Sequence, residues 1–198
     1  ELGAKWDLAE GNLSLRTALF RTEKFNERNT DVDQAADAYL LNGKRHTDGI
    51  EFEAAGRPAP GIEVFGGVAY MRGRIDEAGS SEASQRMVGR ESGLTPRWTG
   101  SVWATWQFAP KWRAGLGADG MSSRVPAQAE SGDSITGIVN RAPGYVKADA
   151  LLEYDAGSWR TRLNLINLFD KVYADGIYRG FTVAGPGRGA QLTVSALF

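Results

Sequence analysis

The residue types that most often carry catalysis or bind metal ions are sparse in this sequence. It has one histidine, His46, and no cysteine, which excludes disulfides and thiolate metal sites. A catalytic histidine needs a partner nucleophile or an activated water, and a metal site needs further ligands. Next to His46 the sequence offers only Asp48. We therefore expect that the protein is not an enzyme and that it has no metal site.

A glycine-rich stretch, Gly185-Pro-Gly-Arg-Gly189, is the other motif that could bind a ligand. A phosphate-binding loop needs a following helix or a Gly-Lys-Ser/Thr ending, and this stretch has neither. The charges argue against a nucleic-acid partner as well, because 23 basic residues face 24 acidic ones and the net charge is −1.

The sequence pattern over most of the chain predicts β-strands. In Thr95 to Ala109, large apolar residues and glycine occupy every second position, and polar residues occupy nearly all the positions between them. Only Trp103 breaks the polar side. The end of the chain, Gly189 to Phe198, alternates in the same way and closes on an aromatic residue. The mean hydropathy is −0.34, and no apolar run approaches the roughly 18 residues of a membrane helix.

Short and long connections between about nine strands alternate along the chain. Short turns are expected near residues 9–12, 58–61, 110–111 and 156–158, and long polar loops near 23–45, 76–94, 122–143 and 174–187. This alternation is typical of outer-membrane β-barrels, which have brief periplasmic turns and longer extracellular loops. The sequence therefore predicts an all-β fold, namely an antiparallel transmembrane β-barrel portion.

The spacing of the aromatic residues fits a membrane. Trp98 and Phe108 lie ten residues apart on one face, which at about 3.3 Å per residue and a tilt near 45° spans roughly 23 Å. The apolar band of such barrels is about 25 Å tall and is flanked by aromatic girdles. We expect Trp98 in the outer girdle and Trp106, Phe108 and Trp112 in the inner one. The alternative is a soluble β domain with scattered core tryptophans.

Several motifs resemble the C-terminus of TonB-dependent outer-membrane receptors, especially the siderophore receptors. They are Asn164-Leu-Ile-Asn-Leu-Phe-Asp-Lys171-Val-Tyr173, Gly185-Pro-Gly-Arg188 and a last strand ending in Phe198, with weaker matches at Leu13 to Phe20, Gly43 to Glu53 and Thr95-Pro-Arg97. The resemblance covers essentially the whole chain. It implies a 22-strand barrel filled by an N-terminal plug that contacts TonB. Residues 1–198 would then be the C-terminal part of that barrel, about nine strands, with the plug absent from this chain.

The resemblance also implies a function and partners. We expect TonB-dependent uptake of a ferric siderophore, with a slight preference for the catecholate type, and no covalently bound cofactor. TonB would act through the missing plug, the barrel would contact outer-membrane lipid, and Phe198 would be the assembly signature for the barrel-assembly machinery. A passive outer-membrane pore or an adhesin barrel stays open as the alternative. A barrel-embedded hydrolase is disfavoured by the missing catalytic set.

Ligand contacts in such a receptor are expected from loops and the upper barrel wall. Arginines and aromatic side chains suit an anionic or aromatic chelate. The candidates are Arg86, Arg90, Arg124, Arg141, Tyr173, Tyr178, Arg179 and Phe181. For each one, the alternative is a solvated loop residue or a salt bridge of the barrel wall. A second set, Lys147, Asp149, Glu153, Arg160 and Arg162, is expected to pair across strands on the lumen side and to hold the plug.

Overall fold

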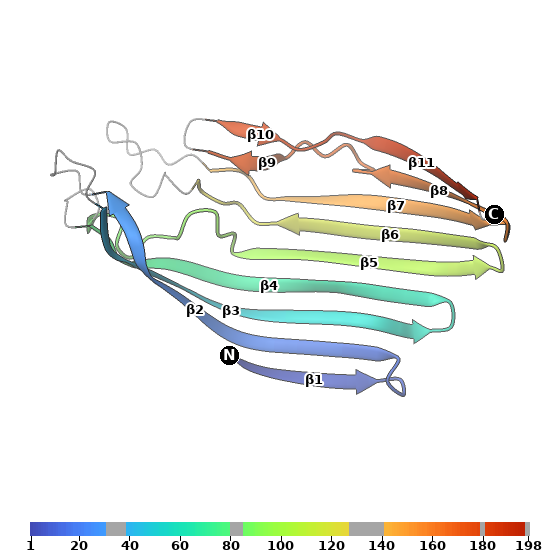
Figure 1. Ribbon diagram of the computed structural model, residues 1–198, viewed down its shortest axis with the longest axis horizontal. Helices are drawn as coiled ribbons and strands as arrows, with labels where there is room; N and C mark the ends of the chain where they lie inside the picture. Colours follow the sequence, from blue (N-terminus) through green and yellow to red (C-terminus); the bar gives the residue numbers. More distant parts are fainter. Residues whose placement is uncertain (31–38, 80–84, 127–140, 179–180, 197–198) are drawn as a thin grey trace.

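The fold is a single curved antiparallel sheet (Figure 1). The computed structural model describes residues 1–30, 39–79, 85–126, 141–178 and 181–196. Within these ranges nine strands pair in the order β1-β2-β3-β4-β5-β6-β7-β8-β11. Their bounds are β1 Leu2–Leu8, β2 Leu13–Thr30, β3 Tyr39–Ala59, β4 Ile62–Glu77, β5 Trp98–Ala109, β6 Trp112–Met121, β7 Tyr145–Asp155, β8 Trp159–Ile166 and β11 Gly189–Ala196. No helix in the described ranges is long and apolar enough to cross a membrane.

The connections fall at two opposite ends of the sheet. Tight turns join β1 to β2, β3 to β4, β5 to β6 and β7 to β8 at one end, which we call the short-turn end, and all the longer connections lie at the other, the loop end (Figure 1). Left-handed backbone at Gly61 (φ 74°) and Gly157 (φ 90°) closes two of the short turns. The predicted alternation of short and long connections is thus confirmed.

The predictions for two of the long loops are partly wrong. Strands β2 and β3 stay paired up to Thr30 and Tyr39, deep inside the loop predicted for residues 23–45. The apolar period disappears there because polar residues occupy adjacent positions, as at Glu23-Lys24 and Asn26-Glu27, and because the register shifts between Lys24 and Glu27, which interrupts the alternation. The loop predicted for 174–187 also contains a short hairpin, formed by β9 Ala174–Ile177 and β10 Thr182–Ala184.

One face of the sheet, which we call the apolar face, carries large hydrophobic side chains that remain exposed. The register places Trp106, Leu116 and Val194 on this face, with exposed fractions of 56, 60 and 64%. Exposed apolar surface on this scale needs an apolar covering, and a lipid bilayer supplies one. The alternative, a soluble β domain, predicts that its tryptophans are buried in a core. Trp98, Trp106 and Trp112 are instead exposed.

The opposite, polar face is packed around glycines. A Cβ atom at Gly117 would lie 2.0 Å from Cε3 of Trp103, and one at Gly115 would lie 2.9 Å from its Cζ2. The indole of Trp103 therefore lies over the backbone of β6. This explains the single exception in the polar alternation of β5, because Trp103 is accommodated by the two glycines of the neighbouring strand.

Aromatic rings gather at the short-turn end of the apolar face. Ring centroids are 5.8 Å apart for Trp106 and Phe108, 6.4 Å for Phe108 and Trp112, and 4.8 Å for Trp112 and Tyr154. Trp98 lies at the opposite end of β5, level with Tyr70 of β4. This arrangement suits the two predicted girdles, and their contact with a membrane interface stays a prediction.

Candidate functional site

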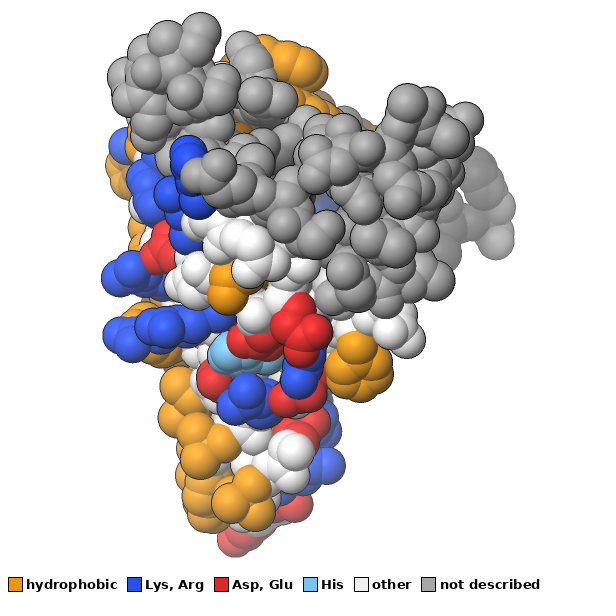
Figure 2. Space-filling model, turned by 90° about the vertical axis from the view of Figure 1, so that its left-hand side faces the viewer, with side chains coloured by type: hydrophobic (Ala, Val, Ile, Leu, Met, Phe, Trp, Pro, Cys, Tyr) orange, Lys and Arg blue, Asp and Glu red, His pale blue; other side chains and the backbone are white. Residues whose placement is uncertain are grey.

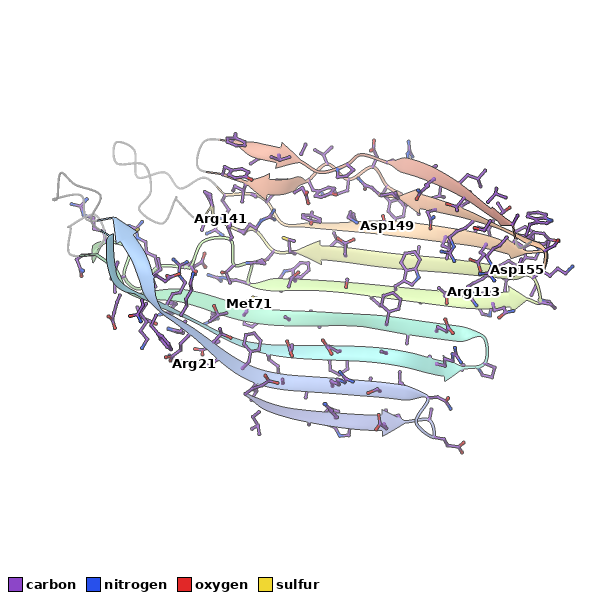
Figure 3. All side chains as sticks on the ribbon, viewed as in Figure 1. Arg21, Met71, Arg113, Arg141, Asp149 and Asp155 are labelled. Atoms are coloured by element: carbon purple, nitrogen blue, oxygen red, sulfur yellow. The ribbon has the colours of Figure 1, made fainter. Side chains whose placement is uncertain are left out.

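The candidate ligand contacts that the structure describes lie at the loop end of the sheet. Labelled Arg141 is found there, whereas labelled Arg113 and Asp155 lie at the short-turn end (Figure 3). A segment of residues 85–97 follows β4 there and continues the sheet. Its backbone bonds run from Gly89 N to the Ile75 oxygen (2.8 Å) and from Ser92 N to the Gly73 oxygen (3.0 Å). Arg86 and Arg90 are exposed on this segment.

Glu91 joins this segment to the connection before β7. Its carboxylate accepts hydrogen bonds from Arg97 (2.5 Å) and from Arg141 (3.1 Å), and Arg141 also donates to the Ser123 hydroxyl (3.1 Å). Hydrogen bonds from Arg97 first and Arg141 second hold the pKa of Glu91 below its usual value. The predicted candidate Arg141 is therefore partly engaged in a clamp between two loop segments.

Arg124 is buried, with only 7% of its surface exposed. Its guanidinium donates to the backbone oxygens of Ala174 (3.0 Å) and Asp175 (2.7 Å) and to the sulfur of Met121 (2.9 Å). These bonds fasten the β9–β10 hairpin to the end of β6. Arg124 thus has a structural role in the hairpin, and a contact of its side chain with ligand stays a prediction.

The tip of the same hairpin carries a stacked aromatic pair. Tyr178 and Phe181 lie with ring centroids 4.6 Å apart and an interplanar angle of 17°, and they are 53% and 61% exposed. The Tyr178 amide donates to the Phe181 oxygen (2.8 Å), which fixes the turn. Two parallel exposed rings offer a flat surface on which a planar aromatic group can stack.

Tyr173 lies at the base of the hairpin and is half-buried. Its ring centroid is 4.4 Å from that of Tyr145, and a Cβ atom at Gly185 would lie within 2.1 Å of it. The structure therefore brings Tyr173, Tyr178 and Phe181 onto one hairpin that Arg124 holds in place. Arg86, Arg90 and Arg141 belong to other segments, while Arg179 and Phe198 lie outside the described residues.

The predicted pairing of charges across strands is present on the polar face. Lys147 binds Asp119 (2.5 Å) and Asp149 (3.2 Å), and Arg162 binds Glu153 (2.6 Å). Arg160 pairs with Asp155 at 2.5 Å. The pairs with Asp119, Glu153 and Asp155 join neighbouring strands, as expected of a cross-strand ladder, and the pair of Lys147 with Asp149 lies within β7. The proposed contact of this ladder with a plug stays a prediction.

His46 lies beside two carboxylates on the apolar-face side of the loop end. Its Nδ1 is 2.7 Å from an oxygen of Asp76, and its Nε2 is 3.6 Å from Asp48. The sequence identified Asp48 but missed Asp76, which comes close only because β3 and β4 pair. No group of three or more possible metal ligands occurs among the residues that the structure describes.

Asn167 is a structural residue whose role the sequence did not reveal. It is 1% exposed, its amide group donates to the oxygens of Lys171 (2.9 Å) and Pro186 (3.0 Å), and its Oδ1 accepts from the Lys171 amide (2.8 Å). Its φ of 51° is left-handed, a conformation that asparagine tolerates. The Asn-Leu-Phe-Asp-Lys motif thus forms a turn that ties β8 to the approach of β11.

Known proteins resemble this chain in sequence and in fold. The family model described as "TonB dependent receptor-like, beta-barrel" matches residues 1–168. A probable TonB-dependent receptor of Bordetella pertussis, BfrD, is 31% identical over 197 residues, which cover 98% of this chain and 26% of BfrD.

Two crystal structures share the fold. The ferric-catecholate import receptor Fiu of Escherichia coli K12 superposes with a TM-score of 0.79 at 30% identity, over 97% of this chain and 26% of Fiu. The siderophore receptor PiuA of Acinetobacter baumannii gives a TM-score of 0.82 at 26% identity, over 97% of this chain and 27% of PiuA. The chain spans about a quarter of the length of the curated relatives it matches. Members of this family are β-barrel proteins of the Gram-negative outer membrane. The family match over residues 1–168 and the shared nine-stranded sheet together establish that this chain belongs to the TonB-dependent receptor β-barrel family.

Proposed function

We propose that the chain is the C-terminal part of the barrel of an outer-membrane receptor that imports ferric siderophores in a TonB-dependent manner. The observation that carries this proposal is the likeness over 97–99% of the chain to receptors named for ferric catecholates or siderophores. The plug and the TonB-contacting segment would belong to the rest of the protein. Binding and gated passage need no bond chemistry, which agrees with a role other than catalysis.

The hairpin β9–β10 supports a catecholate-type ligand. A catecholate presents planar aromatic rings and negative charge, and the exposed Tyr178–Phe181 pair offers a stacking surface at the loop end. Arg86, Arg90 and Arg141 are exposed cations on neighbouring loop segments and suit the charge of the chelate. We assign the rings as the contact surface and the arginines as its charged rim.

The test is ligand binding by the full-length receptor purified from outer membranes. Intrinsic fluorescence would be titrated with an iron complex of a catecholate siderophore, and with an iron complex of a hydroxamate siderophore as the comparison. Tyr178→Ala/Phe181→Ala should weaken catecholate binding about 3- to 10-fold, because a stacked aromatic contact contributes about 0.5–1.5 kcal/mol. The matched control is Phe65→Ala, an exposed ring on the polar face of β4.

The outcomes separate the possibilities. Equal affinity for both chelates would remove the catecholate preference and leave a siderophore receptor. Unchanged binding in Tyr178→Ala/Phe181→Ala would move the contact away from the hairpin. No binding of any iron chelate by the folded receptor would contradict the proposal and favour a passive pore or an adhesin.

A further inference from the structure

The β9–β10 hairpin stands apart from the main sheet. Among the described residues its two strands pair only with each other, and no strand ladder joins them to the nine-stranded sheet (Figure 1). A two-stranded hairpin is at best marginally stable by itself. Side-chain contacts must therefore set where the hairpin lies and how it is oriented.

Two of these contacts hold the base of the hairpin. The side-chain amide of Asn167 donates to the backbone oxygens of Lys171 (2.9 Å) and Pro186 (3.0 Å), which lie before β9 and after β10. The ring of Tyr173 packs on that of Tyr145, with centroids 4.4 Å apart, and Tyr145 is only 8% exposed. These contacts fix the two ends of the hairpin, and they act outside β9 and β10.

Arg124 contacts β9 itself. Its Nη2 donates to the consecutive backbone oxygens of Ala174 (3.0 Å) and Asp175 (2.7 Å), and its Nη1 lies 2.9 Å from the sulfur of Met121. The backbone of Arg124 is held in turn, because it exchanges two hydrogen bonds (3.1 and 2.9 Å) with Ala142, which is 1% exposed. A guanidinium held in this way, with its donors in one plane, fixes the direction of β9 as well as its position.

The positive charge of Arg124 is unfavourable where it lies. The residue is 7% exposed, and no carboxylate lies within ion-pairing distance of it in the part of the chain that the structure describes. Burial of a charge without a counterion costs free energy, and an apolar side chain would attach the hairpin by packing without this cost. The guanidinium is therefore suited to orienting the hairpin rather than to attaching it alone.

The rings of Tyr178 and Phe181 follow directly on the strand that Arg124 orients. Asp175 and Tyr178 are three residues apart, which is roughly 10 Å along a strand. The two rings stack on each other, and the hydrogen bond from the Tyr178 amide to the Phe181 oxygen (2.8 Å) keeps them together. A change in the direction of β9 at Asp175 would therefore displace both rings as a unit.

We propose that Arg124 is the positioning residue of this ring pair: it directs the hairpin so that the rings face the chelate, and it does not touch the chelate itself. This role rests on the proposed function, because it concerns the stacking surface assigned there to a ferric catecholate. It separates buried Arg124 from exposed Arg86, Arg90 and Arg141, whose charges can meet the chelate directly.

The experiment is a double-mutant cycle on the full-length receptor. Arg124→Gln is made in the parent and in Tyr178→Ala/Phe181→Ala, and each protein is titrated with the ferric catecholate used to test the ring pair. In the parent, Arg124→Gln should weaken binding about threefold or more, but no more than loss of the rings does. In the variant without the rings it should change the affinity less than about 1.5-fold, because nothing is left to position.

Two further variants accompany the cycle. Arg21→Gln is the matched control and should bind as the parent does. Arg21 belongs to the cluster of charged side chains around His46 at the loop end (Figure 2), where it pairs with Glu23 and Asp48. Arg124→Lys keeps the charge but lacks the planar set of donors, so it should lose part of the affinity, and only when the rings are present. If Arg124→Gln does not fold, Arg124→Lys replaces it in the cycle.

Amide hydrogen exchange of the ligand-free receptor gives a readout that needs no chelate. Arg124→Gln should accelerate the exchange of residues 174–177 at least about tenfold, and Arg21→Gln should not change it. Unchanged exchange in Arg124→Gln overturns the proposal. Equal losses of affinity with and without the rings also overturn it, because they indicate direct contact of Arg124 with the chelate. A parent that binds no iron chelate contradicts the proposed function instead, and the exchange result then decides whether Arg124 orients the hairpin.

Discussion

At the scale of single residues, Asn167 connects several segments of the fold through hydrogen bonds. It is 1% exposed and makes three hydrogen bonds with its side chain, two of them as donor. A fourth bond joins its backbone amide to Asp149 of β7 (2.6 Å). The side chain of an alanine at this position could make none of the first three, and its left-handed backbone would be less favourable.

We predict that Asn167→Ala destabilises the folded receptor by about 2–4 kcal/mol, since buried partners lose their hydrogen bonds. The midpoint of urea unfolding of the full-length receptor measures this. The control is Asn164→Ala on β8, whose side chain has no hydrogen bond among the described residues and should change stability by less than about 0.5 kcal/mol. Equal midpoints for the two variants would show that the turn contributes nothing to stability.

A second residue-scale prediction concerns Trp103 and its glycine neighbours. Gly117→Ala would place a methyl group 2.0 Å from the indole, so the ring must move. We expect a loss of about 1–3 kcal/mol, the usual cost of overpacking. Gly189→Ala is the control, because nothing lies within 4 Å of a Cβ atom there. A Gly117→Ala variant as stable as Gly189→Ala would contradict the packing of Trp103 over β6.

At the scale of elements, two clusters of ion pairs join separate segments of the loop end. Glu91 joins the 85–97 segment to Arg141, and Glu27 of β2 binds Lys24 (2.8 Å) and Arg45, whose guanidinium also donates to the Ser92 hydroxyl (2.9 Å). Burial raises the pKa of Glu27, but hydrogen bonds from Lys24 and Arg45 outweigh it, so the net pKa is below the usual value. Both clusters therefore depend on ionised carboxylates.

The Glu91 clamp predicts a dependence on pH with a definite sign. Its pKa is lowered in the folded protein, so its stabilising effect is fully present above the ordinary glutamate pKa of about 4.3 and is lost as pH falls through the lowered value. Amide hydrogen exchange of residues 89–97, corrected for intrinsic pH effects, should accelerate below pH about 4. Glu91→Gln should exchange faster already at neutral pH and should show a smaller acid loss than the parent, because only the Glu27–Arg45–Ser92 contacts still depend on an ionised carboxylate.

Glu63→Gln removes a comparable surface pair at the short-turn end and should leave the exchange of residues 89–97 unchanged. Identical pH profiles for the parent and Glu91→Gln would show that the carboxylate does not hold the segment.

The elements also show what could be predicted from the sequence. The alternation of apolar and polar residues was sufficient to predict β5, β6, β7, β8 and β11, because one face of each strand is apolar and the other is polar. The loop-end parts of β2 and β3 were missed because adjacent polar residues, such as Glu23-Lys24 and Asn26-Glu27, and a shift of register interrupt the alternation. Asp76, which binds His46, and the Glu91 clamp were missed because strand register and the path of a loop bring them together, and neither is visible in residue spacing.

At the scale of the whole molecule, the nine strands leave β1 and β11 at the two edges of the sheet. The polar face carries a ladder of paired charges, and the apolar face carries exposed rings and aliphatic side chains. A sheet with these two faces is stable when lipid covers one side and polar protein or water covers the other. This arrangement agrees with the chain being part of a larger barrel.

The whole protein can be isolated from native outer membranes and identified with peptides of this sequence. We predict that its mass is about four times 21.4 kDa, because the chain covers 25–26% of the length of its curated relatives. Intact-protein mass spectrometry measures this. A mass of about 21.4 kDa would mean that these strands function as a small barrel. The assignment of residues 1–198 to the C-terminal part of a plugged barrel would then be wrong.

Uptake of radioactive iron by cells is the most direct test of the proposed function. An iron-starved strain that lacks its own catecholate receptors would express the full-length gene, and accumulation of ⁵⁵Fe supplied as a ferric catecholate would be followed with and without TonB. We predict accumulation only in cells that have TonB. Equal accumulation in cells without TonB would contradict active uptake and indicate a passive pore, and no accumulation in either strain would contradict a role in ferric-catecholate import.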